Sequence, residues 1–246
     1  MLILSQLNDI LGFKDSRGID IFYPNQRLGE SVRGGAHICA PVFGHVPSTQ
    51  PEWRDLMQPR HGLARIKGAE MSGFVQTTAN GEQTVTKFFP AKPGYFYNFE
   101  TREYLKHIFG EALLPNESVL EHSFQLRRAA ECPSADKPMP VSLGWHPYFA
   151  THNEEFTLFI NGTSAVTSDS VTKPAAVYDY FGQTFVLKTK HHVFEFTFFG
   201  VEQIVIWSDD KTRYLCLEPT AYTEKARLLQ PGDMVALSTK INIAEL

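Results

Sequence analysis

Short runs of β-branched and aromatic residues follow one another along the whole chain, separated by turn residues. From 119 to 128, Leu120, Phe124 and Leu126 alternate with polar neighbours, and the run 156–162 ends in Asn-Gly. Such alternation is typical of strands that bury one face, and long stretches of helical spacing are hard to find. The pattern therefore predicts an all-β fold, built as a large antiparallel sandwich.

Three other runs carry more specific predictions. The run 193–199 has apolar residues on both sides and predicts a strand buried between two layers. The runs 203–207 and 213–217 flank a polar turn of five residues and predict a hairpin. The run 101–109 has apolar residues at helical spacing and is compatible with either a short helix or a strand at a sheet edge.

Length and charge limit the kind of protein. The 246 residues suit one domain spanning 1–246, and 43% hydrophobic residues are enough to form a core. The proline-containing stretch 130–140 is interpreted as a connection within that domain. With 23 basic and 27 acidic side chains the formal charge is 23 − 27 = −4, which argues against nucleic acid or an anionic membrane as a partner.

The cysteines and the N-terminus indicate a cytoplasmic protein. Cys39, Cys132 and Cys216 lack metal-ligand spacing and are interpreted as reduced thiols, with Cys39 and Cys216 buried. The first residues lack the cationic region of a signal peptide, and no stretch of 18 apolar residues could span a membrane. Dinucleotide fingerprints, phosphate-binding loops and metal-ligand clusters are also missing, so neither a cofactor nor a metal is expected.

Two glycine-containing segments in the first third of the chain contain basic side chains. The segment 33–44 begins Arg33-Gly34-Gly35; paired glycines could let the backbone approach a ligand, and Arg33 could bind hydroxyls or an anion. The alternative is a tight turn into a buried strand, with Arg33 in solvent. The segment 58–65 contains His61 and Arg65, which either face a site or belong to a loop in which His61 bonds to the backbone.

Two later segments contain the residues suited to proton transfer. His146 lies among large apolar side chains in 143–149, either as a satisfied core residue or as a rigidly held acid or base. Cys216 and Glu218 share one face of a predicted strand. Desolvation there should raise the pKa of the Glu218 carboxyl toward the range of a general base, unless an arginine pairs with it.

Taken together and in this order, the segments RGGAHICAPVFG, HGLAR, GWHPYF and CLEPT, followed by LQPGD, resemble the aldose 1-epimerase (galactose mutarotase-like) family. The resemblance runs from about residue 19 to 243. It implies an antiparallel β-supersandwich with an open groove for a sugar, and interconversion of α and β anomers without metal or organic cofactor. The Arg-Gly-Gly form looks like the branch that contains glucose-6-phosphate 1-epimerases.

The resemblance also implies roles for individual residues. His146 matches the general acid that protonates the ring oxygen, and Glu218 matches the base that takes the proton of the C1 hydroxyl. His61 and Arg65 match positions that hold the sugar. Arg33 matches an arginine that contacts phosphate in the hexose-6-phosphate branch.

Three departures from the family pattern leave alternatives open. The start of the chain, about 1–18, is atypical and short, so an edge of the sandwich is expected to be missing or replaced. Met71 stands where a tryptophan is more usual, and the substrate-contacting aspartate has only Asp179 as a counterpart. A carbohydrate-binding protein of the same fold without catalysis therefore remains the alternative to an isomerase acting on a small sugar, and an exposed sheet edge would suit a homodimer.

Overall fold

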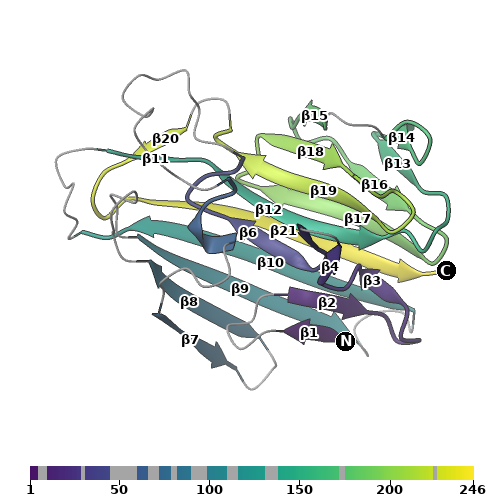
Figure 1. Cartoon of the computed structure of the whole chain (residues 1–246), viewed down its shortest axis with the longest axis horizontal. Coiled ribbons are helices and arrows are strands. Elements are labelled where there is room, and N and C mark those ends of the chain that lie inside the picture. The colour runs from purple at the N-terminus through teal and green to yellow at the C-terminus, as the bar shows by residue number, and fades with distance from the viewer. Residues whose placement is uncertain are drawn as a thin grey trace.

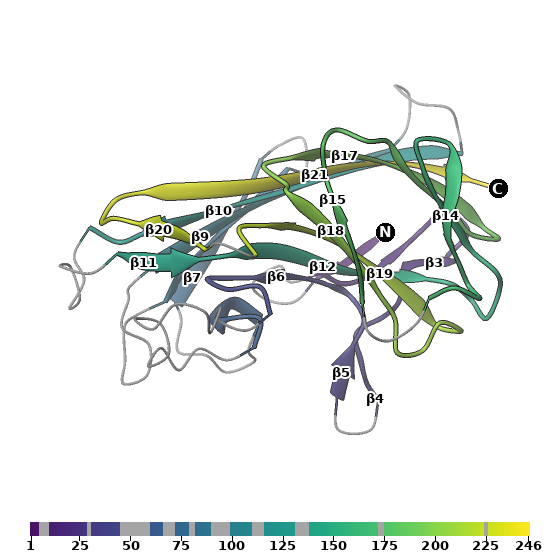
Figure 2. The ribbon, with the colours of Figure 1, turned by 90° about the horizontal axis from the view of Figure 1, so that it is seen from above.

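Two large antiparallel sheets form most of the computed structural model of the chain (Figure 1). The structure describes residues 1–4, 10–28, 31–44, 60–65, 72–78, 82–89, 99–109, 116–130, 138–171, 175–223 and 226–246. Seen from above, the two sheets lie face to face (Figure 2). The predicted antiparallel β-supersandwich is confirmed.

The first sheet has eight strands among the described residues and carries the residues of interest for function. Its order is β1-β2-β3-β12-β19-β18-β15, and β6 pairs with both β12 and β2. The strands are β1 (Leu2–Leu4), β2 (Ile10–Lys14), β3 (Asp20–Phe22), β6 (Ala36–Cys39), β12 (Leu143–Ala150), β15 (Ala176–Asp179), β18 (Gln203–Trp207) and β19 (Tyr214–Ala221).

The second sheet has nine strands in the described part of the chain, in the order β14-β13-β16-β17-β21-β10-β9-β8-β7. The strands are β7 (Ser72–Thr77), β8 (Gln83–Phe89), β9 (Phe99–Phe109), β10 (Glu117–Arg128), β13 (Thr157–Ile160), β14 (Thr163–Thr167), β16 (Phe185–Lys188), β17 (His192–Phe199) and β21 (Met234–Glu245).

Five short elements complete the described structure. Strands β11 (Met139–Val141) and β20 (Arg227–Leu229) pair with each other, and η2 (Leu63–Arg65) is a turn of 3-10 helix. Strands β4 (Gln26–Leu28) and β5 (Ser31–Arg33) form a hairpin that projects away from the two sheets (Figure 2). No helix in the described ranges has the length and apolar character needed to cross a membrane.

Aromatic side chains between the sheets form much of the core. Phe149 of β12 contacts Phe194 of β17 at a centroid distance of 5.1 Å, with the rings at 60°. Phe22 of β3 packs edge-on against Phe149 at 5.2 Å. Such edge-to-face contacts add to the stabilisation gained by removing apolar area from water. They hold β12, and therefore the face that it turns away from the core, in a fixed position.

Two predictions for individual strands are wrong for identifiable reasons. The run 101–109 is not a helix but part of β9, and β9 lies between β8 and β10 rather than at the edge of the sheet. The run 193–199 is not buried on both sides: Glu195 and Thr197 are exposed, and Phe199 is 64% exposed. The predicted hairpin is confirmed, with Trp207 of β18 opposite Cys216 of β19.

The N-terminal residues do form an edge of the first sheet. Leu2 of β1 is opposite Phe13 of β2, and β1 ends the sheet. The atypical start therefore supplies edge strands, and the predicted homodimer through this edge stays a prediction.

Candidate active site

His146 and Glu218 lie opposite each other on adjacent strands of the first sheet. Strand β12 pairs with β19 so that Gly144 faces Thr220 and Tyr148 faces Cys216, which puts His146 level with Glu218. The Nε2 atom of His146 lies 3.4 Å from Oε2 of Glu218. Because the side chains of a strand alternate, both project from the sheet face that is turned away from the core.

Burial shifts the proton affinities of this pair in opposite directions. His146 and Glu218 are 4% and 3% exposed. Burial raises the pKa of Glu218 to about 8, although the positive charges of Arg65 and Arg60 oppose the rise. Burial also lowers the pKa of His146 well below 6.5, and the positive charge of Arg65 lowers it further. The pKa of Glu218 thus shifts in the predicted direction, and the two shifts together favour a protonated carboxyl beside a neutral imidazole.

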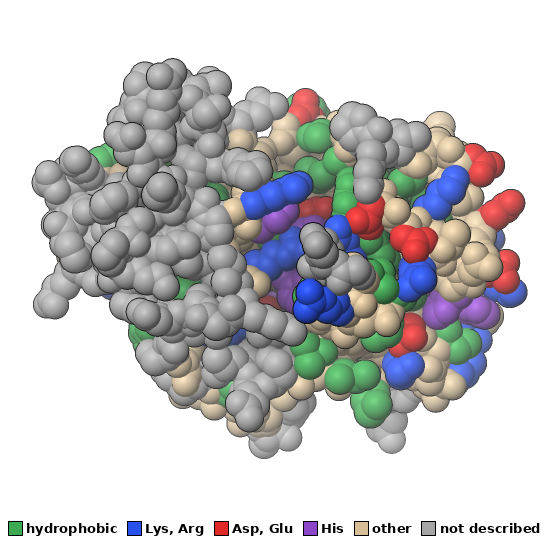
Figure 3. Space-filling view, in the orientation of Figure 1, with side chains coloured by type: hydrophobic (Ala, Val, Ile, Leu, Met, Phe, Trp, Pro, Cys, Tyr) green, Lys and Arg blue, Asp and Glu red, His purple; other side chains and the backbone are tan. Residues whose placement is uncertain are grey.

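A cavity of about 460 Å³ opens above the pair. Its size is within the range of small-molecule sites. Basic and histidine side chains gather around the hollow on this face of the molecule (Figure 3). The aromatic and ionisable side chains that line the cavity are Arg33, Phe43, Arg60, His61, Arg65, His146, Tyr148, Trp207 and Glu218.

Arg65 and Tyr148 form one wall beside His146. Nη2 of Arg65 donates a hydrogen bond of 2.8 Å to the hydroxyl of Tyr148. The Tyr148 ring stacks on His146 at 4.7 Å and 11°, which restrains the imidazole. The buried Nη1 of Arg65 has no hydrogen-bond partner among the described residues, so one donor remains to be satisfied.

His61 reaches the cavity because of an unusual backbone at the segment 60–65. It has a φ of 66°, and the following Gly62 has a φ of 73°. A Cβ at Gly62 would lie 2.1 Å from the carbonyl oxygen of Ala40, so only glycine fits there. The amide of Gly44 donates to Nδ1 of His61 at 3.3 Å, which places the proton of the neutral ring on Nε2. Both interpretations of His61 hold: it bonds to the backbone, and it lines the cavity 5.5 Å from the His146 ring.

Arg33 also lines the cavity but has a carboxylate partner. Its Nη2 lies 2.7 Å from Oδ2 of Asp209, and its guanidinium lies 5.4 Å from the centroid of Trp207. The hydroxyl of Tyr214 donates to the same Asp209. The positive charge of Arg33 is therefore largely neutralised, contrary to the alternative that leaves it in solvent.

The turn itself requires the paired glycines. A Cβ at Gly34 would lie 2.2 Å from the carbonyl oxygen of Pro24, and one at Gly35 would lie 2.2 Å from that of Ile10. The two residues have φ values of 93° and 73°. They form the tight turn into the buried strand β6 that the sequence offered as one of its two interpretations.

Asp179 is not brought to the cavity. It lies on the same sheet face as Glu218, but at the far end of β15 from Ala175, which does line the cavity. Its Oδ1 accepts a hydrogen bond of 3.0 Å from Gln203 at the exposed surface. Met71 and Cys132 lie outside the described residues.

Period-two alternation separates the aromatic residues next to His146. Tyr148 lines the cavity because it is two positions from His146 on the same strand face, whereas Trp145 and Phe149 point into the core. Asp209 is the residue of the site that the sequence did not single out. Asp209 lies in the turn between β18 and β19, and nothing in the local sequence indicated that it would pair with Arg33.

One group of potential metal ligands occurs in the described part of the chain. The ligand atoms of His146, Cys216 and Glu218 lie within 4.8 Å of one another, and all three residues are buried. Burial raises the pKa of the Cys216 thiol well above 9.0. Cys39 is likewise buried, which confirms the prediction for both cysteines.

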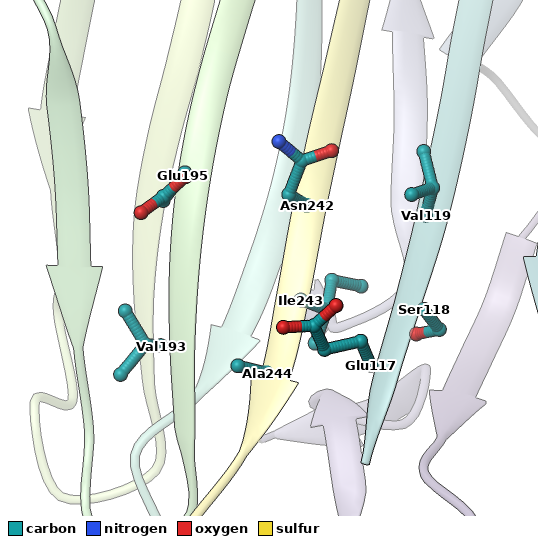
Figure 4. Close-up of a pocket in the computed structure, with 8 residues that line it drawn as sticks. All are labelled: Glu117, Ser118, Val119, Val193, Glu195, Asn242, Ile243 and Ala244. Atoms are coloured by element: carbon teal, nitrogen blue, oxygen red, sulfur yellow. The ribbon is translucent and has the colours of Figure 1, made fainter. Parts of the chain in front are cut away.

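A second hollow of about 360 Å³ lies on the outer face of the second sheet. Figure 4 shows Glu195 of β17, Asn242 of β21 and Val119 of β10 side by side on this face. Its described lining has carboxylates but no histidine, cysteine or arginine. It therefore does not offer the pair of proton-transfer groups found in the first cavity.

Comparison with known proteins establishes the fold. No family model and no curated protein matches the chain. Among solved structures, a galactose mutarotase related enzyme from Lactobacillus acidophilus is 17% identical, with a TM-score of 0.67 over 100% of this chain and 94% of that one. A galactose mutarotase-like protein from Lactobacillus casei ATCC 334 is 13% identical, with a TM-score of 0.70 over 96% and 93%. A third, from Clostridium acetobutylicum, is 13% identical, with a TM-score of 0.66 over 100% and 92%.

The chain thus has the galactose mutarotase-like fold, as the family resemblance predicted.

Proposed function

We propose that this protein is an aldose 1-epimerase, an isomerase that interconverts the α and β anomers of a hexose or a hexose 6-phosphate. The observation that carries the proposal is the pair His146 and Glu218, 3.4 Å apart at the floor of a cavity of about 460 Å³. The fold of mutarotase-like proteins supports the same reaction class.

Opening a pyranose ring requires two proton transfers. A base removes the proton of the C1 hydroxyl, and an acid delivers a proton to the ring oxygen. The aldehyde then rotates about the C1–C2 bond and closes on its other face, with both transfers reversed. General acid–base catalysis supplies about 10²- to 10⁴-fold, roughly 3 to 5 kcal/mol of the barrier.

We assign Glu218 as the base and His146 as the acid, and the proton count of the pair fits a reversible reaction. A carboxylate with an imidazolium holds the same number of protons as a neutral carboxyl with a neutral imidazole. The first form opens the ring. The second form, which burial favours, is the one that closes the open-chain aldehyde.

The cavity walls suit a sugar. The rings of Tyr148 and Trp207 line it and can pack against the C–H faces of a pyranose. The buried Nη1 of Arg65, which has no described partner, is a donor for an oxygen that gains negative charge.

A phosphorylated hexose is the narrower form of the proposal. Arg33, Arg60 and Arg65 all line the cavity, which favours an anionic group. Asp209 already pairs with Arg33, however, so a phosphate at Arg33 would have to compete with that carboxylate.

The second candidate is a carbohydrate-binding protein without turnover. The position of Asp179, which lies away from the cavity and bonds to Gln203, favours it. The presence of both His146 and Glu218 in proton-transfer positions favours the enzyme.

Exchange NMR on free and 6-phosphorylated hexoses separates these candidates. An epimerase raises the rate of α–β exchange above the spontaneous rate for at least one sugar. Binding of a sugar with no increase in exchange would support the binding protein instead.

We also infer that β1, which ends the first sheet, is where a homodimer would form. A monomer by light scattering at micromolar concentration would remove this part of the proposal.

A further inference from the structure

We propose that His146, Cys216 and Glu218 form a binding site for a soft divalent metal ion of the Zn²⁺ type, which blocks the sugar site when it is bound. The binding claim stands independently of the proposed function, whereas the inhibition claim rests on it.

The three side chains have the identities and positions that such an ion needs. A thiolate, an imidazole and a carboxylate are the usual ligands of Zn²⁺. Cys216 and Glu218 are two positions apart on one face of β19, and His146 lies level with Glu218 on the neighbouring strand β12. The site is therefore built on two paired strands of the sheet, which hold the ligands better than a loop would.

The distances require only a small contraction. Metal–ligand bonds of about 2.0 to 2.3 Å put ligand atoms roughly 3.3 to 3.8 Å apart around a tetrahedral ion. The pair His146 Nε2 and Glu218 Oε2 is already at 3.4 Å, and all three ligand atoms lie within 4.8 Å of one another. Side-chain movement of about 1 Å closes the remaining gap, and a water oxygen from the cavity fills the fourth position.

Buried polar atoms without a hydrogen-bond partner also favour a ligand at this site. Oε2 of Glu218 is buried and has no hydrogen-bond partner among the described residues. Nδ1 of His146 is in the same state, so the imidazole is not committed to a described acceptor. Buried polar atoms are usually satisfied, and a ligand in this position would satisfy the carboxylate.

The charge of the site accommodates the ion. Arg65 lies close enough for its positive charge to favour ionised Cys216 and Glu218. Metal binding displaces the protons of a thiol and a carboxyl. Two protons thus leave when the divalent ion binds, and the net charge of the buried site is unchanged. His146 and Glu218 line the cavity, so the ion has a path from solvent.

The bound ion would occupy both proton-transfer groups. With its lone pair on the metal, His146 cannot exchange a proton, and the Glu218 carboxylate cannot accept one. Metal binding and epimerisation are therefore mutually exclusive.

Cobalt titration tests the binding claim on the reduced, metal-free full chain. We expect a thiolate-to-Co²⁺ charge-transfer band in the near ultraviolet that saturates at one ion per chain and disappears when Zn²⁺ is added. Cys216→Ala should lose the band, and Cys39→Ala should keep it. Cys39 is the matched control because it is equally buried in the same sheet.

A second variant covers the case in which Cys216→Ala does not fold. Glu218→Gln keeps the shape of the side chain and should weaken Co²⁺ binding at least tenfold, roughly the loss typical for an altered metal site. No band in the wild type, or a band that persists in folded Cys216→Ala, would overturn the site. So would unchanged Co²⁺ affinity in Glu218→Gln.

Inhibition is measured separately by exchange NMR. Zn²⁺ should suppress the anomer exchange of the wild type competitively with the sugar. Cys216→Ala should lose much less of its own metal-free rate at the same Zn²⁺ concentration. Metal binding without inhibition would overturn the second claim alone. A protein that binds Co²⁺ but never accelerates exchange would instead refute the proposed function and leave the metal site standing.

Discussion

Nε2 of His146 and Oε2 of Glu218 lie 3.4 Å apart, and burial shifts the pKa values of the two groups in opposite directions. The pair therefore keeps one proton over a wide pH range, and burial favours the form in which Glu218 carries it. Reversible ring opening needs a pair that holds one proton, because one proton leaves the C1 hydroxyl as another reaches the ring oxygen, and both transfers are reversed on closure.

The pH dependence of kcat/KM should be a bell. The active pair holds one proton; raising the pH through about 8 removes it from Glu218, so activity falls on the alkaline side. On the acid side, activity falls only well below pH 6.5, where a second proton reaches His146. Exchange NMR from pH 5 to 9, corrected for spontaneous mutarotation, checks this. A rate that keeps rising through pH 9 would contradict it.

Glu218→Gln should stabilise the fold increasingly as the pH rises. The folded-state pKa of about 8 lies above the ordinary 4.5, so between these values the folded chain binds a proton that the unfolded chain releases. Glu218 therefore contributes a loss of free energy of unfolding to the wild type as the pH rises from 5 to 8, and the variant lacks this contribution. The difference in Tm between the two proteins should grow over this range, by about 2–4 °C for each kcal/mol of difference in the free energy of unfolding.

The exposed Glu195 of β17 offers the matched control, because Glu195→Gln removes a carboxylate on a solvent-facing strand side. Its Tm should follow the wild type at every pH. A Glu218→Gln Tm that differs from wild type by a constant amount would show that the carboxyl is not desolvated as described.

Asp209→Asn should improve turnover of glucose 6-phosphate relative to glucose. The substitution releases Arg33 from its ion pair and leaves the guanidinium available to a phosphate, which should lower KM for the phosphorylated sugar about tenfold. Arg33→Glu should do the opposite and spare glucose. Asp210→Asn is the control, since Asp210 pairs with Arg213 instead. Equal effects on both sugars would exclude a phosphate at Arg33.

Acid should destabilise the fold through His192. Its Nε2 lies 3.2 Å from Oδ2 of Asp15, and burial lowers the pKa of His192 to about 4. Between pH 6.5 and 4 the unfolded chain takes up a proton that the folded chain does not, so stability falls as the pH falls. His192→Gln should lose less Tm than the wild type from pH 7 to 5. An equal loss would assign the acid sensitivity to other groups.

The sequence predicted the strands well where one face is buried, and less well elsewhere. Alternation identified β10, whose buried residues include Leu120, Phe124 and Leu126. It failed for β17, because Phe199 is an aromatic residue that the sheet leaves in solvent. Whether a large apolar side chain on a strand is buried depends on which strands pack against it. The hydrophobic pattern of one segment does not record this.

The site was only partly predictable because its contacts join distant segments. His146 and Glu218 are 218 − 146 = 72 positions apart, and only the register of β12 with β19 brings them together. The sequence motifs singled out each residue separately, but the distance of 3.4 Å between their side chains is known only from the structure. The Arg33–Asp209 pair is similar: it joins β5 to a turn 209 − 33 = 176 positions later. Asp179 was predicted to contact the substrate, but it lies at the end of β15 that is farther from the cavity.

Anomer exchange by Glu218→Gln is the most direct test of the central claim. The variant keeps the shape of the side chain and removes the proton acceptor, so turnover should fall about 10²- to 10⁴-fold while sugar affinity changes much less. His146→Asn should lose a similar factor, and the double variant little more than either, because the two transfers act as a unit. A folded Glu218→Gln protein that exchanges anomers at the wild-type rate would contradict the mechanism and leave only the fold.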